Sequence, residues 1–190
     1  MKKVALLRGV TPVGQNCIPK MAYLAEILTE AGLENVKTYI QSGNIVFETT
    51  LSDGDVCALI HDTIQAKIGA DLSVILKTQA QFTTALAESP FDESYDDSRV
   101  HLVFTNDHLD QEILNELLEM DFGAEILKAG SECLYLYLPR EAKKKRLNTN
   151  YLEKQLHITA TMRKRRSILR LSRCDTIVTC IDRNERKDIP

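Results

Sequence analysis

The chain has 190 residues, of which 44% are hydrophobic and 27% are charged, and this balance is typical of a globular protein with one or two domains. Its five cysteines are an odd number without a Cys-x-x-Cys pair, so the sequence indicates neither a disulfide framework nor a zinc site. No apolar run is long enough for a signal peptide or a membrane-spanning helix, and the expected location is therefore the cytoplasm.

The net charge of −3 is unevenly distributed along the chain. Residues 140–190 hold 15 of the 24 lysines and arginines against six acidic residues, so this segment carries +9 and residues 1–139 carry −12. A basic segment of this kind suits a polyanion such as RNA. It equally suits two oppositely charged lobes that attract each other, or a contact between subunits.

Apolar periodicity predicts six elements in residues 1–88. Residues 4–7 are a short apolar run, which indicates a central strand buried on both faces. Further strands are expected over 36–40, 45–48 and 72–77, and helices over 21–31 and 53–67, the second of them capped by Ser52. Between the second and third strands lies a tight hairpin signal, in which Gly43 supplies a positive φ. The order strand, helix, strand, strand, helix, strand is the ferredoxin-like βαββαβ arrangement.

A degenerate copy of this pattern is predicted beyond a short capped helix at Thr78 and an acidic linker. The predicted division is a first ferredoxin-like domain over 1–88, a linker over 89–98, and a second ferredoxin-like domain over 99–190. The second domain ends with a basic amphipathic helix that contains Ile168 and Leu171, followed by a tail. The expected fold class is therefore α+β, with two ferredoxin-like sandwich lobes and an added C-terminal helix.

Distinctive motifs occur over nearly the whole chain. They comprise residues 5–9, Val13-Gly14 with Asn16, Met21 with Leu24, the hairpin block 38–47, and the C-terminal segments 152–154 and 159–163. Together these motifs resemble a family of bacterial proteins grouped as domain of unknown function 1697. The resemblance implies two ferredoxin-like lobes and no known activity.

The chain departs from this family pattern at two places. Residues 11–14 read Thr-Pro-Val-Gly, with an apparent one-residue insertion, where the family usually has Asn-Val-Gly-Gly. Lys164 and Arg165 stand where the family usually has Asn-Trp. Any binding role that the family gives to these positions is not expected to carry over unchanged.

The N-terminal motifs are predicted to meet at one edge of the first sheet. The third strand of a ferredoxin-like sheet lies antiparallel to the first, so the end of the first strand meets the hairpin. The first helix begins at this edge with unpaired N–H groups, and the loop over 10–18 can cover it. We expect a small polar pocket suited to a phosphate or carboxylate. The predicted ligand-binding residues are Arg8, Gly9, Asn16, Gln41, Ser42, Gly43 and Asn44.

Other interpretations of the sequence stay open. The hairpin residues can serve the turn alone, and Arg8 can pair with a neighbouring acid. The protein can instead bind RNA or another polyanion, or it can be a homo-oligomeric interaction protein without a ligand. No histidine, cysteine or carboxylate pair in the motifs has a recognisable catalytic arrangement, so no metal or cofactor is predicted. An enzyme that acts on the small ligand stays open, with its substrate and reaction unspecified. The candidate polyanion-binding residues are Lys143, Lys144, Lys145, Arg146, Arg163, Lys164, Arg165 and Arg166.

Overall fold

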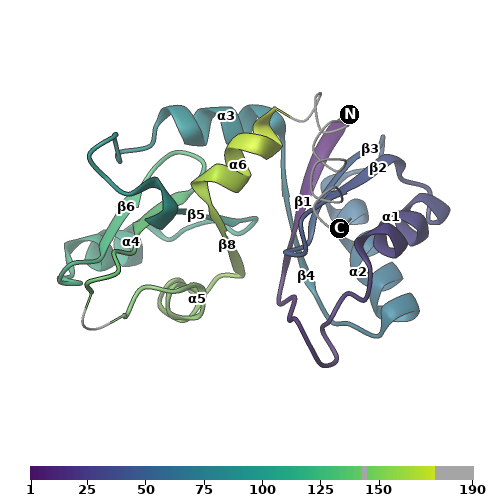
Figure 1. Ribbon diagram of the computed structural model, residues 1–190, viewed down its shortest axis with the longest axis horizontal. Coiled ribbons are helices and arrows are strands. Elements are labelled where there is room, and N and C mark those ends of the chain that lie inside the picture. The colour runs from purple at the N-terminus through teal and green to yellow at the C-terminus, as the bar shows by residue number, and fades with distance from the viewer. Residues whose placement is uncertain (143–144, 174–190) are drawn as a thin grey trace, which may run out of the picture.

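The computed structural model describes residues 1–142 and 145–173 of the chain (Figure 1). Within these residues, six α-helices and eight β-strands form a mixed α+β structure with two four-stranded antiparallel sheets. No described helix is long and apolar enough to cross a membrane. Lys143, Lys144 and the predicted tail after residue 173 lie outside the described residues.

The first lobe is built around β1 (Lys2–Arg8). The sheet has the strand order β2-β3-β1-β4, with every neighbouring pair antiparallel. As the sequence predicts, β1 is central and buried on both faces, and residues 4–7 are at most 1% exposed. The other elements of this lobe are α1 (Met21–Glu30), β2 (Glu34–Tyr39), β3 (Asn44–Glu48), α2 (Asp53–Ile68) and β4 (Ser73–Lys77).

The second lobe repeats the same connections with the strand order β6-β7-β5-β8. The sequence predicts this copy as a degenerate one, and β6 and β7 indeed have only four residues each. The lobe consists of β5 (Val100–Thr105), α4 (Gln111–Glu119), β6 (Ile126–Ala129), β7 (Leu134–Tyr137), α5 (Thr149–Leu156) and β8 (Ala160–Lys164). Helix α3 (Gln79–Ala87) and the 3₁₀ turn η1 (Asp97–Arg99) connect the lobes, and α6 (Arg165–Ser172) follows β8.

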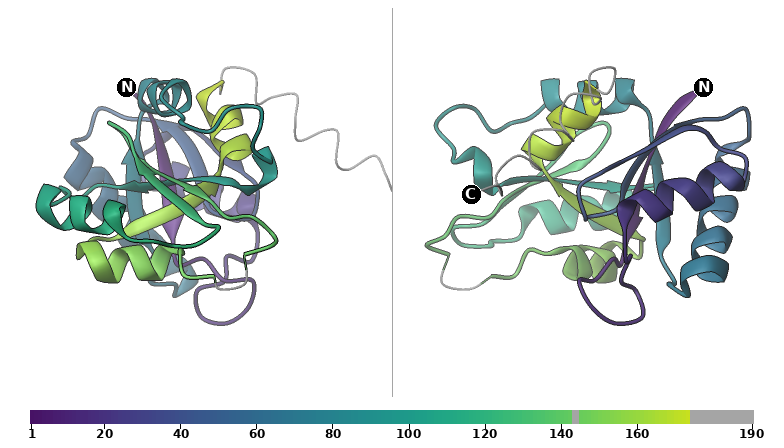
Figure 2. Two further views of the ribbon diagram at one scale, coloured as in Figure 1. Left: turned by 90° about the vertical axis from the view of Figure 1, so that its left-hand side faces the viewer. Right: turned by 45° about the vertical axis from the view of Figure 1, so that its right-hand side comes forward.

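The two sheets share a central apolar layer. Helices α1 and α2 cover the outer face of the first sheet, and α4 and α5 cover the outer face of the second (Figures 1 and 2). The inner faces bury Val4 and Leu6 of β1 together with Phe104 of β5 and Tyr135 of β7, and α3 and α6 pack into the same layer. The aromatic side chains of Phe104 and Tyr135 are therefore fully buried rather than displayed on an open sheet.

Local signals in the sequence account for several element ends. Ser52 accepts a hydrogen bond from the Asp55 amide at the start of α2, and Thr78 forms a capping box with Gln81 at the start of α3. Gly43 has φ 73°, and a Cβ on it would lie only 2.8 Å from Cβ of Leu7. Glycine is therefore required at this position both for the turn and for the close approach of the hairpin to β1.

The predicted end of the second strand is wrong. The second strand was expected to include Ile40, but β2 ends at Tyr39, which pairs directly with Asn44. The four residues between them reverse the chain, and Ile40 adopts φ 51° in this turn. An exposed β-branched residue thus takes the left-handed conformation because the turn requires it.

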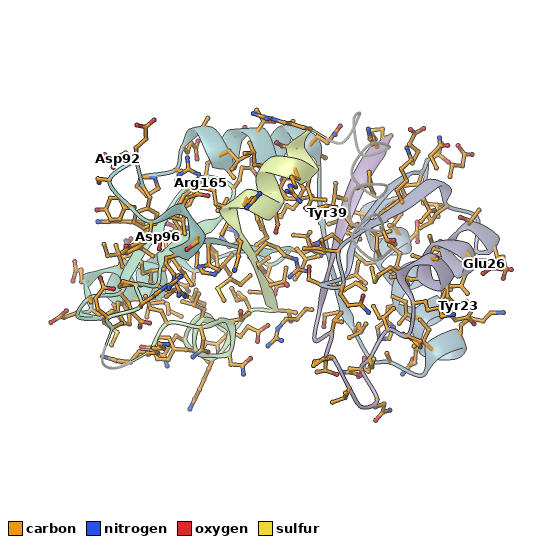
Figure 3. The ribbon with its side chains drawn as sticks, in the orientation of Figure 1. Tyr23, Glu26, Tyr39, Asp92, Asp96 and Arg165 are labelled. Carbon is orange, nitrogen blue, oxygen red and sulfur yellow. The ribbon has the colours of Figure 1, made fainter. Side chains whose placement is uncertain are left out.

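The acidic segment over 89–98 packs against the second lobe. Phe91 is buried in the central layer, and Arg165 Nη1 donates a 3.0 Å hydrogen bond to the Phe91 carbonyl. Asp92 and Asp96 accept hydrogen bonds within the segment, and Arg165 lies beside it (Figure 3). These contacts hold the segment in a defined path between the lobes.

Candidate functional site

A groove of about 440 Å³ lies between the lobes, where the end of β1 and the β2–β3 hairpin face Thr149 and β8. It is formed at the sheet edge where the sequence predicts a polar pocket. Two arginines and no acidic residue line it. The lining residues are Leu7, Arg8, Gly9, Val10, Thr11, Pro12, Gln41, Ser42, Thr149, Thr161, Met162 and Arg163.

Arg8 spans the groove to helix α5. Its Nε and Nη2 donate hydrogen bonds of 3.0 and 2.8 Å to the two carboxylate oxygens of Glu153, and Nη2 also contacts Asn150 Oδ1 at 2.5 Å. The remaining nitrogen, Nη1, has no hydrogen-bond partner within residues 1–142 and 145–173. Arg8 thus pairs with an acid, as one interpretation of the sequence expects, and still has two N–H donors that the pair does not use.

The Arg8–Glu153 pair shifts the pKa of both groups. The hydrogen bonds to Glu153 are the largest effect on Arg8, and its pKa is raised. Burial favours the neutral form of Glu153, but the hydrogen bonds from Arg8 and from the Ala160 amide, with the charge of Arg8, outweigh burial. The pKa of Glu153 is therefore lowered, and the pair is ionised at neutral pH.

Arg163 is buried in the wall of the groove, with 8% of its surface exposed. Burial lowers its pKa to about 10, so the guanidinium remains charged at neutral pH. All five of its N–H groups donate to neutral oxygens, at distances from 2.7 to 3.0 Å. The acceptors are Asn44 Oδ1, Thr161 Oγ1 and the backbone carbonyls of Leu7, Ser42 and Met162.

Most of the predicted ligand-binding residues lie at or beside the groove. Arg8, Gly9, Gln41 and Ser42 line it. Asn44 is fully buried behind it and holds the hairpin, because its Nδ2 donates to the Tyr39 carbonyl and to Ser42 Oγ at 2.9 Å each. Gly43 permits the same hairpin to approach β1.

Asn16 does not line the groove. Its side-chain amide exchanges hydrogen bonds with the backbone of Asp71, at 3.2 and 3.1 Å, and so anchors the loop over 10–18 to the chain before β4. The N-terminus of α1 is also absent from the lining. The predicted pocket is therefore closed by the second lobe rather than by this helix.

Four residues of the second lobe complete the groove or hold its arginines: Asn150, Glu153, Thr161 and Arg163. Three of them belong to the C-terminal segments that carry the family resemblance. Membership in these segments was the signal in the sequence that could have assigned them to the site. Sequence reasoning grouped Arg163 with the surface basic residues, because no local pattern shows that β8 packs beside β1.

The remaining basic residues have separate surroundings. The Arg146 guanidinium lies over the rings of Phe122 and Tyr151, 5.3 and 5.9 Å from their centres. Lys164 and Arg166 are exposed, whereas Arg165 contacts the acidic segment. Among the described residues, the basic run over 163–166 is therefore divided between the interior and the surface.

Metal-ligating side chains and thiols also occur in the described part of the chain. No group of three or more histidine, cysteine, aspartate or glutamate side chains there is arranged to hold a metal ion. Cys17, Cys57 and Cys133 are free thiols.

Comparisons with known proteins give a family and a related structure. The family model with the description "Protein of unknown function (DUF1697)" matches residues 1–135. The chain is also similar to a solved structure, the conserved bacterial protein SP0830 from Streptococcus pneumoniae, with 25% identity and a TM-score of 0.70. That similarity covers 90% of this chain and 96% of the other. No curated protein matches the chain.

Proposed function

The chain belongs to the DUF1697 family of proteins of unknown function, as its motifs predict, and we propose that the groove binds a small anionic ligand with a phosphate or carboxylate group. One observation carries this proposal: two arginines and no acidic residue line the groove. Arginine recognises both kinds of group through paired N–H donors.

The charges around the groove favour an anion. Glu153 compensates the charge of Arg8, but every hydrogen-bond acceptor of Arg163 is neutral. Neutral acceptors satisfy the N–H groups without cancelling the charge. One net positive charge thus remains beside the groove, where burial weakens the screening by solvent.

Arg8 supplies the hydrogen-bond donors that we propose for the ligand. Its Nη1 donates no hydrogen bond to the described residues, while Nε and Nη2 hold the guanidinium against Glu153. A guanidinium fixed in this way loses little rotational freedom when a ligand binds. The Ser42, Thr149 and Thr161 hydroxyl groups lie in the same lining and can add polar contacts.

Ligand screening with matched variants tests the proposal. Thermal shift and calorimetric titration are measured with inorganic phosphate, citrate, glucose 6-phosphate, AMP and a short RNA. We expect at least one small anion to stabilise the wild type, and Arg8→Ala to weaken its binding by about tenfold or more, through the loss of a charged hydrogen bond. Lys20→Ala is the matched control, since it removes an exposed positive charge outside the groove.

A second variant separates binding from stability. Glu153→Gln keeps an acceptor for Arg8 and removes the competing negative charge, so we expect it to bind the same anion more tightly. Unfolding of each variant without ligand shows whether the fold is retained. Equal affinities in wild type, Arg8→Ala and Glu153→Gln would refute the proposed site. Stabilisation by RNA alone, unchanged in Arg8→Ala, would favour the polyanion alternative instead.

We further propose that each lobe is a ferredoxin-like unit and that residues 89–98 separate two such domains. The identical strand orders and connections of the two lobes support this assignment. The two proposed units bury apolar side chains in one shared central layer, so we expect each of them to be less stable alone than in the intact chain.

A further inference from the structure

A second cavity, of about 360 Å³, lies where the end of β4 meets the β5–α4 connection and the β6–β7 hairpin. It shares no lining residue with the groove at Arg8. Polar side chains and the apolar side chains of Leu114 and Ile158 line it together, so it offers both an apolar surface and hydrogen-bonding groups to a small molecule. Its polar lining includes Lys77, Asn106, Asp107, His108, Ser131 and Glu132.

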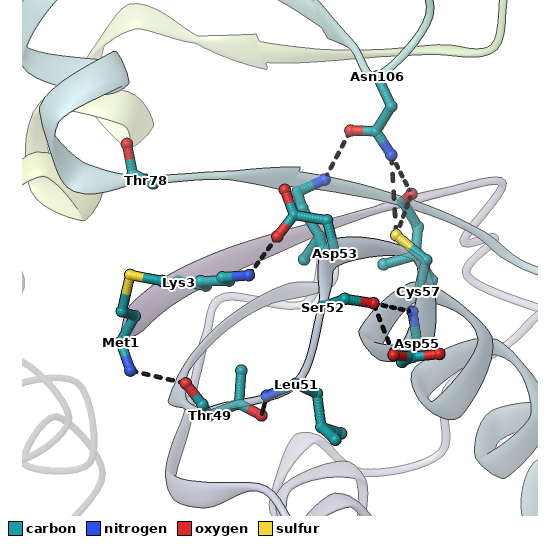
Figure 4. Close-up of polar contacts among 12 residues, drawn as sticks. Met1, Lys3, Thr49, Leu51, Ser52, Asp53, Asp55, Cys57, Thr78 and Asn106 are labelled. Carbon is teal, nitrogen blue, oxygen red and sulfur yellow. Dashed lines mark hydrogen bonds and ion pairs between the residues drawn. The ribbon is translucent and has the colours of Figure 1, made fainter.

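Lys77 is the amine of this cavity. It is the last residue of β4 and is partly buried, yet its ammonium group forms no hydrogen bond or ion pair with the described residues. The nearby acids have other partners, because Glu132 accepts a 2.8 Å hydrogen bond from Gln81 Nε2 and Asp53 pairs with Lys3 (Figure 4 shows the second pair). The lysine therefore lies in a confined space without a counterion in contact.

This environment favours the neutral, nucleophilic form of the amine. Burial lowers the pKa of Lys77, and it outweighs the opposite influence of Glu132, Cys133 and Asp53. The Cys133 thiol does not compete as a nucleophile, since burial raises its pKa to about 12. A lysine that is desolvated in a cavity is a common nucleophile toward carbonyl carbon.

We propose that Lys77 is a reactive amine that forms an imine with a small aldehyde or ketone in this cavity. The lone pair of neutral Nζ attacks the carbonyl carbon, the C=O π electrons move to oxygen, and one proton passes from nitrogen to that oxygen. The resulting carbinolamine loses water as the C=N bond forms. No oxidation or reduction takes place, and hydrolysis reverses the step.

Reductive labelling of the full-length wild type tests this proposal. The protein is treated at pH 7 with a limiting amount of propionaldehyde and with sodium cyanoborohydride, whose hydride reduces the imine carbon and leaves a stable secondary amine. Peptide mass spectrometry then gives the labelling rate of each lysine. We expect Lys77 to react several-fold faster than Lys67, which is exposed on α2, since a lowered pKa raises the neutral fraction of an amine at pH 7.

Two further measurements complete the test. The labelling rate of Lys77 should be half-maximal at a pH below 10.4, which is about the ordinary pKa of lysine. Lys77→Arg should abolish the fast labelling phase, and Lys67→Arg should leave it unchanged. Labelling of Lys77 in the wild type at the rate of Lys67, or at a lower rate, would overturn the proposal. That result is independent of ligand binding at Arg8, so the two proposals fail separately.

Discussion

Ile40 adopts a left-handed backbone conformation in the β2–β3 turn, with φ 51°, although 46% of its surface is exposed. This conformation costs about 1–2 kcal/mol for an ordinary L-residue, and asparagine tolerates it better. We expect Ile40→Asn to raise the free energy of unfolding by about 1 kcal/mol in urea titration. Leu51→Asn is the control, because Leu51 is similarly exposed and has no positive φ. An equal effect of both substitutions would show that the turn gains nothing from asparagine.

Strand β4 lies at an edge of the first sheet. A side chain from the other lobe covers this edge, since Asn106 Oδ1 accepts from the Leu76 amide and Nδ2 donates to the Val74 carbonyl, both at 2.9 Å (Figure 4). One amide side chain thus bonds to β4 as a neighbouring strand would. It satisfies the backbone of an edge strand and joins the two lobes at the same time.

Replacement of Asn106 should weaken this edge. We expect Asn106→Ala to lower the free energy of unfolding by about 1–2 kcal/mol, since the Leu76 amide loses its partner and the Val74 carbonyl keeps only the weaker contact with Cys57 Sγ. Asn106→Asp should cost at least as much, because a carboxylate cannot donate to the Val74 carbonyl. Hydrogen exchange measured residue by residue should show faster exchange of the Leu76 amide. The amide of Leu6 in the central strand is the internal control, and equal acceleration at both positions would contradict a local effect.

Local chemistry made the elements of this fold predictable. The caps at Ser52 and Thr78 and the glycine at position 43 depend on neighbours a few residues away, and each was confirmed. The partners of Arg8 were not predictable in this way. Glu153 lies 145 residues beyond Arg8, and its role depends on how two sheets pack face to face. Apolar periodicity identifies which residues are buried, but it does not identify the part of the chain against which they pack.

At the scale of the molecule, the Arg8–Glu153 pair joins the lobes through ionised groups. The pKa of Glu153 is lowered in the folded protein, so the folded state binds fewer protons at this group than the unfolded chain does. Its contribution to stability is complete above the unfolded pKa of about 4.3 and is lost as the pH falls through the lower folded value.

We therefore expect acid to destabilise the wild type more than Glu153→Gln. The free energy of unfolding, measured by urea titration between pH 7 and pH 3, should fall more steeply for the wild type. Glu26→Gln, on the exposed side of α1, should behave like the wild type (Figure 3). Parallel curves for all three proteins would mean that the pair contributes nothing to stability.

Arg163 also constrains the order in which the chain can complete its structure. Its guanidinium donates hydrogen bonds to Oδ1 of Asn44, which lies 119 residues earlier, and to the carbonyls of Leu7 and Ser42. During synthesis on a ribosome, the first lobe emerges long before this partner is available. Its groove edge must therefore remain hydrated until β8 has been translated. Chains truncated before β8 should thus expose this edge. We expect the protein to need a chaperone most while the first lobe has been synthesised and β8 has not.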